Sequence, residues 1–231
     1  MFDFHSHILP QMDDGSRSVA ESIGMLEVAA KQGVVAMAAT PHYYRSRESI
    51  DRFLTRRAAS HAALNEALIE DETAALPALR LGAEVAFFTE MSRDPALAEL
   101  CIAGTDCLLV EMPFSEWGSH TVNEIYAILS NFDLTLVLAH VERYADFQNQ
   151  SQRLFDLLDM GVYLQMNAEY IIASSSRRNA LKFLKAGWPC LLGSDCHNLT
   201  SRKPNLGEAW QIVEAKLSRV QVAAMKNLVR L

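Results

Sequence analysis

Short apolar runs alternate with longer amphipathic segments along most of the chain. The runs typical of buried strands occupy residues 1–4, 34–39, 79–86, 107–112, 134–139, 162–166 and 189–192. Between them, apolar residues recur at the three- and four-residue spacing of a helix with one buried face. Strands that alternate with helices predict an α/β architecture with a parallel sheet, and seven such strands suit a barrel.

Several helix ends are marked by their residue types. Ser18 and Glu21 have the spacing of a capping box in front of an apolar stripe that stops at Gly33. Gly161 and Gly187 follow helical stretches and precede strands, as C-terminal caps do. These residues predict where the chain passes between helix and strand.

The length and composition fit a single domain that spans residues 1–231. Half of the 231 residues are hydrophobic and 21% are charged, which is enough to bury one large core. Helices are predicted over residues 50–69 and 208–231, the second packing outside the barrel, with residues 70–76 as a connector inside the domain. We find no secretory signal and no apolar stretch of membrane-spanning length, so we expect a cytoplasmic protein without membrane insertion.

Charge and cysteine content exclude some classes of protein. The net charge is -7 and no basic run is present, which argues against a general nucleic-acid binder. The four cysteines show no CxxC spacing, so neither a zinc ribbon nor a disulfide framework is indicated. They are interpreted as small buried side chains in a reducing compartment.

Seven segments of the chain place a histidine or an acid at or just past an apolar run. These residues are His5, His7, Asp14, His42, Glu84, Glu111, His140, Asp195 and His197. Taken singly, each has an ordinary alternative: a solvated histidine, a turn at Asp14, or a salt-bridged core carboxylate. Their joint placement at the same end of several strands predicts a metal-lined pocket at the C-terminal mouth of a barrel.

The donor set narrows the choice of metal. Five imidazoles and four carboxylates without a required thiolate favour Mn²⁺, Fe²⁺ or Zn²⁺. Nine ligands are more than one ion needs, so we expect two or three ions that share a bridging carboxylate and a bridging hydroxide. Clusters of this kind hydrolyse phosphate esters.

The motifs together resemble the polymerase and histidinol phosphatase (PHP) superfamily. The resemblance rests on His-x-His near the N-terminus, Thr-Pro-His, the glutamates in two strands, Ala-His-x-Glu-Arg-Tyr, Gly-Ser-Asp-x-His-Asn and the helix pattern over residues 21–33. Within that superfamily the chain is most similar to the bacterial tyrosine-protein phosphatases linked to capsular and exopolysaccharide synthesis. One departure is Val141, where proline is common in the family.

The resemblance implies a fold and a set of residue roles. It implies a distorted seven-stranded (β/α)7 TIM-like barrel with a trinuclear, often manganese, centre at the C-terminal mouth of the strands. The nine residues above match the family's ligand positions one by one, and Arg143 and Arg202 match arginines that hold the substrate phosphate.

The same resemblance implies a function. The chain would be a protein-tyrosine phosphatase in which a metal-bridging hydroxide attacks phosphorus. Its substrate would be a phosphotyrosine-containing protein, the tail of a membrane-associated tyrosine autokinase that regulates capsule and exopolysaccharide synthesis. A homo-oligomer is compatible with this family, and the chain itself does not indicate an oligomeric state.

One other mechanism for the same reaction and three other functions are weighed against this one. Residues 196–202 have the Cys-x5-Arg spacing of phosphatases with a cysteine nucleophile, although their glycine-rich phosphate loop is missing. A small-molecule phosphatase such as histidinol-phosphate phosphatase would use the same metal centre. A metal-dependent nuclease fits the acidic charge poorly, and a non-catalytic metal-stabilised binding module does not explain both arginines.

Overall fold

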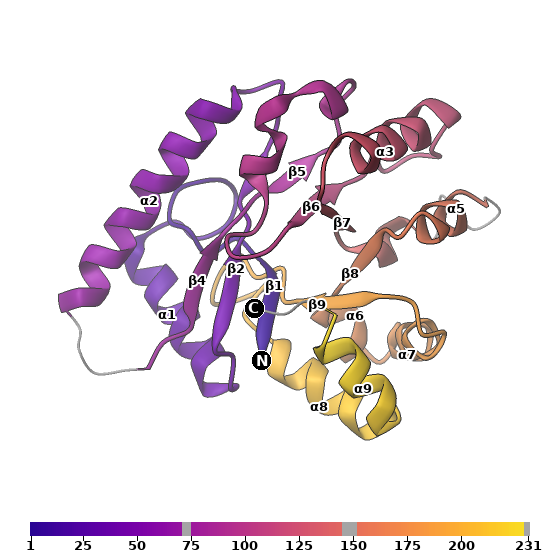
Figure 1. Ribbon diagram of the computed structural model, residues 1–231. Coiled ribbons are helices and arrows are strands. Elements are labelled where there is room, and N and C mark those ends of the chain that lie inside the picture. The colour runs from indigo at the N-terminus through magenta and orange to yellow at the C-terminus, as the bar shows by residue number, and fades with distance from the viewer. Residues whose placement is uncertain (71–74, 145–151, 229–231) are drawn as a thin grey trace.

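The strands lie at the centre of the molecule and the helices lie around them (Figure 1). The computed structural model describes residues 1–70, 75–144 and 152–228. The strands are β1 (Phe2–Ser6), β2 (Ala36–Ala39), β3 (His42–Tyr43), β4 (Ala78–Leu81), β5 (Glu84–Ala86), β6 (Cys107–Glu111), β7 (Thr135–Leu138), β8 (Tyr163–Asn167) and β9 (Cys190–Gly193). The helices are α1 (Val19–Lys31), α2 (Ile50–Glu70), α3 (Ser119–Asn131), α5 (Arg153–Asp159), α6 (Ala168–Ile172), α7 (Arg177–Lys185), α8 (Leu206–Lys216) and α9 (Arg219–Lys226), with 3-10 turns η1 (Met91–Arg93), η2 (Pro95–Leu100) and η3 (Val141–Tyr144). This order confirms the predicted α/β class.

The strands pair in parallel in two sheets. One sheet has the order β1-β2-β4 and the other has the order β3-β5-β6-β7-β8-β9. The chain passes from the first sheet to the second twice, at residues 40–41 between β2 and β3 and at residues 82–83 between β4 and β5. Pro41 cannot donate a backbone hydrogen bond, and its carbonyl accepts one from the Glu84 N–H at 3.1 Å. The single strand expected over residues 79–86 is therefore wrong: it is two strands in different sheets.

The two sheets also meet where β1 ends. The backbone N–H of Asp195 donates to the His5 carbonyl at 2.8 Å, and the His7 N–H donates to the Cys196 carbonyl at 2.9 Å. Because Asp195 and Cys196 follow β9, the last strand lies beside the first. The strands form a curled parallel layer, and their carboxyl ends gather on one side.

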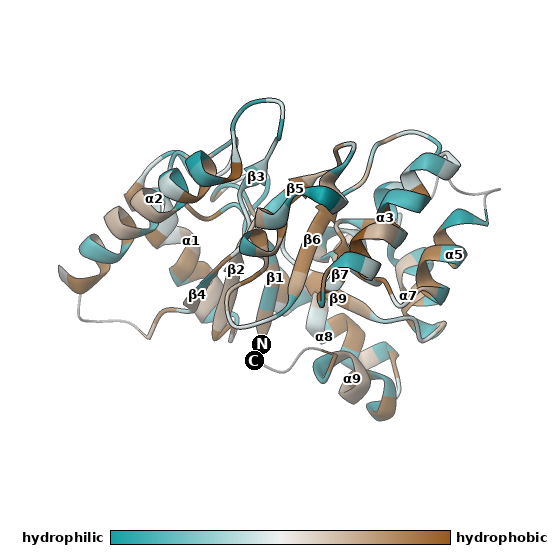
Figure 2. Cartoon of the chain, turned by 45° about the horizontal axis from the view of Figure 1, so that its top comes forward, coloured by the Kyte–Doolittle hydropathy of each residue, from teal (hydrophilic) through white to brown (hydrophobic). Residues whose placement is uncertain are grey.

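Most strands are buried on both faces, and β4 is the partly exposed exception. In β6, Leu108 and Val110 join the large core cluster together with side chains of the helices. The alternate residues Cys107 and Leu109 face a smaller cluster that includes Phe4 of β1. Figure 2 shows the strands as largely hydrophobic, whereas the helices carry both hydrophobic and hydrophilic residues. Burial on two faces explains why the strands appear in the sequence as unbroken apolar runs.

The helix ends agree with most of the predicted signals. The Ser18 side chain caps α1 by accepting from the Glu21 N–H at 3.2 Å. The Glu21 carboxylate accepts from the Arg17 N–H at 2.8 Å and not from Ser18, so the expected capping box is only half formed. Positive φ angles occur after helices as predicted, at Gly33 (81°), Gly161 (88°) and Gly187 (81°).

The remaining predicted helices are also present. Helix α2 confirms the segment expected over residues 50–69. In place of the single helix expected over residues 208–231 there are two, because α8 begins earlier, at Leu206, and the chain leaves the helix at residues 217–218 before α9. Most of the connector at residues 70–76, and residues 229–231 of the last segment, lie outside the described residues. Within the described ranges, none of the helices combines the length and apolar character needed to cross a bilayer.

Gly193 at the end of β9 is a sharp test of this packing. A Cβ atom there would lie 2.5 Å from the His5 Cβ and 2.9 Å from the His5 backbone nitrogen, so β1 would have to move. We expect Gly193→Ala to lower the free energy of unfolding by about 1–3 kcal/mol, measured by urea denaturation.

Gly24→Ala is the matched control. Its Cβ would meet only the Leu199 side chain, at 2.9 Å, and this side chain is 41% exposed and free to move. Since alanine also favours the helix, this variant should be as stable as the wild type or more so. Equal stability of both variants would contradict the close approach of β9 to β1.

Candidate metal centre

The structure brings all nine predicted ligands to the carboxyl ends of the strands. His5 lies in β1 and His7 directly after it, His42 lies in β3, Glu84 begins β5, Glu111 ends β6, His140 follows β7, and Asp195 and His197 follow β9. Asp14 comes from the loop between β1 and α1. Parallel strands place their carboxyl ends together, so residues far apart in sequence converge on one region.

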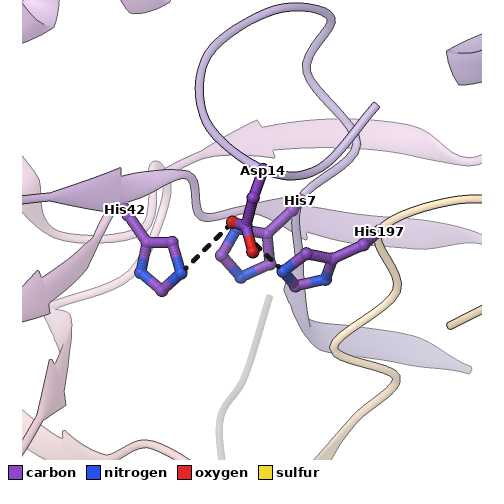
Figure 3. A group of neighbouring side chains, drawn as sticks. All are labelled: His7, Asp14, His42 and His197. Carbon is purple, nitrogen blue, oxygen red and sulfur yellow. Dashed lines mark ion pairs between the residues drawn. The ribbon is translucent and has the colours of Figure 1, made fainter. Parts of the chain in front are cut away.

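One group of ligand atoms surrounds the Asp14 carboxylate. Figure 3 shows this carboxylate between the rings of His42 and His197, with His7 beside them. Its Oδ1 atom lies 3.5 Å from Nε2 of His42 and 3.5 Å from Nε2 of His197. One donor atom from each of the four residues lies within 4.8 Å of the others. Three imidazoles and one carboxylate at these separations could hold one divalent ion.

Glu84 lies at the centre of two further groups. Its Oε2 atom is 3.2 Å from Nε2 of both His5 and His7 and 2.9 Å from Nδ1 of His42. One set of atoms within 4.8 Å comprises His5, His7 and Glu84, and another comprises His42, Glu84 and Glu111. Because Glu84 belongs to both sets and has a second oxygen near His140, its position suits a carboxylate shared between ions.

His140 and Glu111 complete this side of the cluster. Nε2 of His140 lies 2.8 Å from Oε1 of Glu84 and 3.3 Å from Oε1 of Glu111. Burial favours the neutral acid, but the charge on His5 and the hydrogen bond from His140 hold the pKa of Glu84 well below its ordinary value. Burial opposes the charge on His140, yet its hydrogen bonds to Glu111 and Glu84 raise its pKa to about 9. The Glu84 carboxylate is therefore held in its charged, metal-binding form.

Asp195 connects the ligand cluster to the two predicted arginines. Its Oδ1 atom lies 3.6 Å from Nε2 of His5 and 3.4 Å from Nε2 of His7. Its Oδ2 atom accepts hydrogen bonds from Arg143 at 2.9 Å and Arg202 at 2.7 Å. Burial opposes ionisation, but His5, His7 and Arg202 hold the pKa of Asp195 well below its usual range.

The backbone at two candidate ligands is strained. Asp195 has a φ of 51° and His140 has a φ of 33°, a region that non-glycine residues rarely occupy. The hydrogen bonds around both side chains hold these conformations. Such strain is typical of functional positions, where the surrounding structure fixes a side chain in an otherwise unfavourable place.

Among the candidate ligands, four buried polar atoms have no partner with hydrogen-bond geometry in the described residues. They are Nδ1 of His42, Oε2 of Glu84, Nδ1 of His140 and Nε2 of His197, although the first two lie 2.9 Å apart as an ion pair. A buried polar atom without a partner is costly, so such atoms call for an explanation. Three of them, on His42, Glu84 and His197, belong to residues of the converging groups, where a divalent cation would satisfy them. The residues present therefore fit a metal centre.

The sequence analysis missed Asp13, which holds two of the ligands in place. Its Oδ2 atom lies 2.7 Å from Nδ1 of His7 and accepts the backbone N–H of His42 at 2.8 Å. Burial opposes a charge on His7, but Asp13 raises its pKa well above the ordinary value. A carboxylate on one ring nitrogen directs the other nitrogen toward a metal. The signal was the paired Asp-Asp in the Met-Asp-Asp-Gly loop, of which only Asp14 was considered.

Gln165, in β8, was also missed and fixes the proton on His5. The backbone N–H of His140 donates to Gln165 at 2.7 Å, and since a backbone N–H can only donate, the receiving atom must be the amide oxygen. The same oxygen lies 2.9 Å from Nδ1 of His5, so that ring nitrogen carries the proton. Nε2, which faces Glu84 and His7, is then the ring nitrogen that would bind a metal ion after losing its proton.

The side-chain amide of Gln165 also links His5, through Asn167, to Asp195, the residue that accepts from both arginines. Its Nε2 donates to Oδ1 of Asn167 at 2.9 Å, and Nδ2 of Asn167 donates to Oδ2 of Asp195 at 2.8 Å. Gln165 and Asn167 are alternate polar residues at the end of an otherwise apolar strand, which was a usable signal. Amides are weak ligands for these metals, so a search for imidazoles and carboxylates passed over them.

The Cys196 loop is not built to cradle phosphate. The backbone N–H groups of His197 and Asn198 both donate to the Arg202 carbonyl, at 2.8 and 3.2 Å. The N–H groups of Thr200 and Arg202 donate to the Asn198 side chain. Cys196 itself is fully buried, and burial raises the pKa of its thiol. A nucleophilic thiolate with free N–H groups around an anion is therefore not what this loop forms.

The arginines are accessible beside the cluster. The side chains of Arg143 and Arg202 are 40% and 38% exposed, although each donates to Asp195. Both line a cavity of about 350 Å³ together with Asn167, Asp195 and Lys203. Val141, the departure from the family pattern, is buried at the start of η3 and leaves the Arg143 N–H bonded to the His140 carbonyl at 2.9 Å.

Comparison with known proteins gives a consistent result. The model of the family described as "Capsular polysaccharide synthesis, CpsB/CapC" matches residues 1–228. Tyrosine-protein phosphatase YwqE of Bacillus subtilis is 30% identical over 225 residues, 93% of this chain and 84% of that protein. Tyrosine-protein phosphatase CpsB of Streptococcus agalactiae is 29% identical over 230 residues, 92% of this chain and 89% of that protein.

A solved structure shares the fold. It belongs to a study of YwqE from Bacillus subtilis and CpsB from Streptococcus pneumoniae, described as unique metal-dependent tyrosine phosphatases. The TM-score is 0.84 at 24% identity, with 99% of this chain and 92% of that chain covered. The likeness extends over nearly the whole chain.

Gln165→Leu tests whether the β8 amide prepares His5 for a metal. The variant removes the acceptor of the His5 proton, so we expect manganese affinity to fall about 10- to 100-fold, measured by isothermal titration calorimetry. Gln211→Leu, the same change at an exposed position of α8, should leave the affinity unchanged. Equal affinities in folded samples of both variants would contradict the role of Gln165.

Proposed function

Because the chain belongs to the CpsB/CapC family of capsular polysaccharide synthesis proteins, we propose that it is a metal-dependent phosphatase that removes phosphate from tyrosine in a protein. Its two named relatives are tyrosine-protein phosphatases and match more than nine-tenths of the chain. The observation that carries the proposal is the convergence of imidazoles and carboxylates beside two accessible arginines. This combination suits a phosphate ester, which needs both cations and hydrogen-bond donors.

A closed barrel of seven strands is part of the proposal. In the chain, β3 follows β2 after two residues, and β5 follows β4 in the same way. We therefore count each of these pairs as one interrupted strand of the barrel. With β1 and β6 to β9 the total is seven. Closure is supported by the hydrogen bonds of His5 with Asp195 and of His7 with Cys196.

Two or three divalent ions would be held by the nine candidate ligands. Manganese is our first choice, with iron(II) and zinc as alternatives, because the donors are imidazole nitrogens and carboxylate oxygens. Bound divalent ions would lower the pKa of a water molecule to supply the nucleophile and would neutralise charge on the phosphoryl oxygens. Glu84 would bridge ions, since its two oxygens face different histidines.

The arginines would bind the phosphoryl group. Each guanidinium has five N–H donors in a planar fork. One of its terminal nitrogens donates to Oδ2 of Asp195. Donors that remain can form charge-assisted hydrogen bonds with phosphate oxygens. Asp195, which also accepts from Asn167, holds both arginines beside the cluster, where they would bind the phosphate between the ions and the guanidinium groups. The phenol of tyrosine, with a pKa near 10, leaves more readily than an alkyl alcohol.

The natural substrate in this proposal is a phosphotyrosine segment of a protein, specifically the tail of a membrane-associated tyrosine autokinase. The capsular polysaccharide context of the family supports a partner of this type. The net charge of -7 fits this choice better than a nucleic-acid substrate. A flexible tail could reach the accessible side of the cluster, where Arg143 and Arg202 are exposed.

Chelation is the direct test of the metal requirement. Hydrolysis of a phosphotyrosine peptide should disappear after treatment with chelator and return with Mn²⁺, Fe²⁺ or Zn²⁺ added singly. Loss of a residue that only hydrogen-bonds to a metal ligand typically costs about 10- to 100-fold. His5→Ala removes a proposed ligand itself, so it should lower kcat/KM by more than that. Cys196→Ser should keep its activity, since the thiol is buried.

Two outcomes would contradict the proposal. Activity that ignores chelator and disappears in Cys196→Ser would indicate a thiol nucleophile. Hydrolysis of histidinol phosphate but not of the peptide would indicate a small-molecule phosphatase.

Replacing either arginine tests phosphate binding. Arg143→Lys and Arg202→Lys keep the charge but lose the planar fork, so we expect kcat/KM on the peptide to fall about 10- to 100-fold. Metal affinity should change little, because neither residue is a proposed ligand. Arg93→Lys is the control, since this arginine is 76% exposed and pairs only with Glu90 among the described ion pairs. Unchanged kcat/KM in both test variants would remove the arginines from the substrate site.

A further inference from the structure

An exposed phenyl ring lies against one of the candidate ligands. The Phe114 side chain is 47% exposed, and its ring is stacked on that of His140 with centroids 5.7 Å apart and planes 21° apart. The ring also packs near that of Tyr144, with centroids 5.6 Å apart. Phenylalanine has no polar atom, so its exposure at a highly polar cluster has no explanation in hydrogen bonding.

Hydrogen bonds with two buried aromatic side chains hold the loop on both sides of Phe114. The Met112 N–H donates to the Tyr144 hydroxyl at 2.8 Å, and the Trp117 indole N–H donates to the Pro113 carbonyl at 3.0 Å. Trp117 and Tyr144 are both buried and contact each other edge to face, with centroids 5.2 Å apart. The exposed ring is therefore held in one place, so little flexibility is lost when another group binds to it.

The other aromatic side chains in residues 1–70, 75–144 and 152–228 do not offer the same surface. Tyr126 and Phe155 are also exposed, but Phe155 packs on Trp188, and among the described ring contacts neither touches a candidate ligand. Tyr44 lies 5.3 Å from the His42 ring, and the Arg47 guanidinium already lies 4.3 Å from its ring centroid. Among the described residues, Phe114 is thus the apolar ring at the cluster that keeps a large exposed area.

The position of Phe114 relates it to the phosphate site. The His140 ring, on which Phe114 is stacked, lies 5.9 Å from the His5 ring between centroids. Nε2 of His5 is 3.6 Å from Oδ1 of Asp195, whose other carboxylate oxygen accepts from the guanidinium group of Arg143. A phosphate held by Arg143 would bring the group esterified to it next to this part of the surface.

We propose that Phe114 is a specificity residue that stacks on the aromatic ring of an aryl phosphomonoester, and so selects phosphotyrosine over alkyl phosphates. This inference rests on the proposed phosphatase function. Aromatic pairs prefer offset-stacked or edge-to-face arrangements at centroid distances that the existing pair of Phe114 and His140 already shows. An alkyl phosphate has no ring to stack and gains only ordinary apolar contact.

Two inhibitors separate ring recognition from leaving-group chemistry. Benzylphosphonate and butylphosphonate carry the same charged group and are not hydrolysed, so their inhibition constants report binding alone. Each is measured as a competitive inhibitor of phosphotyrosine-peptide hydrolysis by the metal-loaded full chain. The wild type should bind benzylphosphonate more tightly, and Phe114→Leu should remove about three- to tenfold of that preference.

Matched variants control for folding and for general loss of apolar surface. Phe114→Tyr keeps the ring and should keep the preference. Phe155→Leu makes the same change at a ring that is 44% exposed and packs on Trp188, and it should leave the preference unchanged.

The outcomes distinguish this inference from the function on which it rests. A wild type that hydrolyses the peptide without preferring benzylphosphonate, or a preference unchanged in Phe114→Leu, would overturn the role of Phe114 alone. Failure of the wild type to hydrolyse the peptide with any of the three metals would overturn the proposed function and this inference with it.

Discussion

The burial of Glu84 is the constraint on which the rest of the site depends. This carboxylate is only 1% exposed, and an ionised group in such a place is stable only if positive or hydrogen-bonding partners surround it. Four imidazoles lie around it, from β1, β3 and the segments after β1 and β7. Those segments must end on the same side of the sheet. The interruption between β2 and β3 at Pro41 allows β3 to pair with β5, so that His42 lies opposite Glu84.

Much of this arrangement was predictable because the fold imposes a simple rule on the sequence. A strand buried on both faces is apolar throughout, so a polar residue at its end, such as Glu111 after Leu108 to Val110, is conspicuous. Repetition of that pattern indicated that the carboxyl ends share a site. The family resemblance added the arginines, which exposed side chains alone would not have identified.

The parts that were not predicted depend on contacts between distant segments. The interruption at Gly82 follows from strand pairing, which a continuous apolar run does not reveal. Gln165 hydrogen-bonds His5, 160 positions away in sequence, and Asn167 hydrogen-bonds Asp195, 28 positions away. Neutral amides do not stand out among candidate ligands. At Ser18, the spacing of a capping box was present, but Glu21 bonded to Arg17 instead.

The exposure of the ligand side chains is uneven, and this bears on how ions enter and leave. Asp14 is 65% exposed on a loop, whereas His5, His7 and Glu84 are almost completely enclosed at the strand ends. An ion that Asp14 would hold is therefore nearer to solvent than one beside Glu84, and the enclosed side chains would have to move before the inner ion could leave. If the centre holds more than one ion, the one bound by Asp14 would exchange more readily with metal ions in solution.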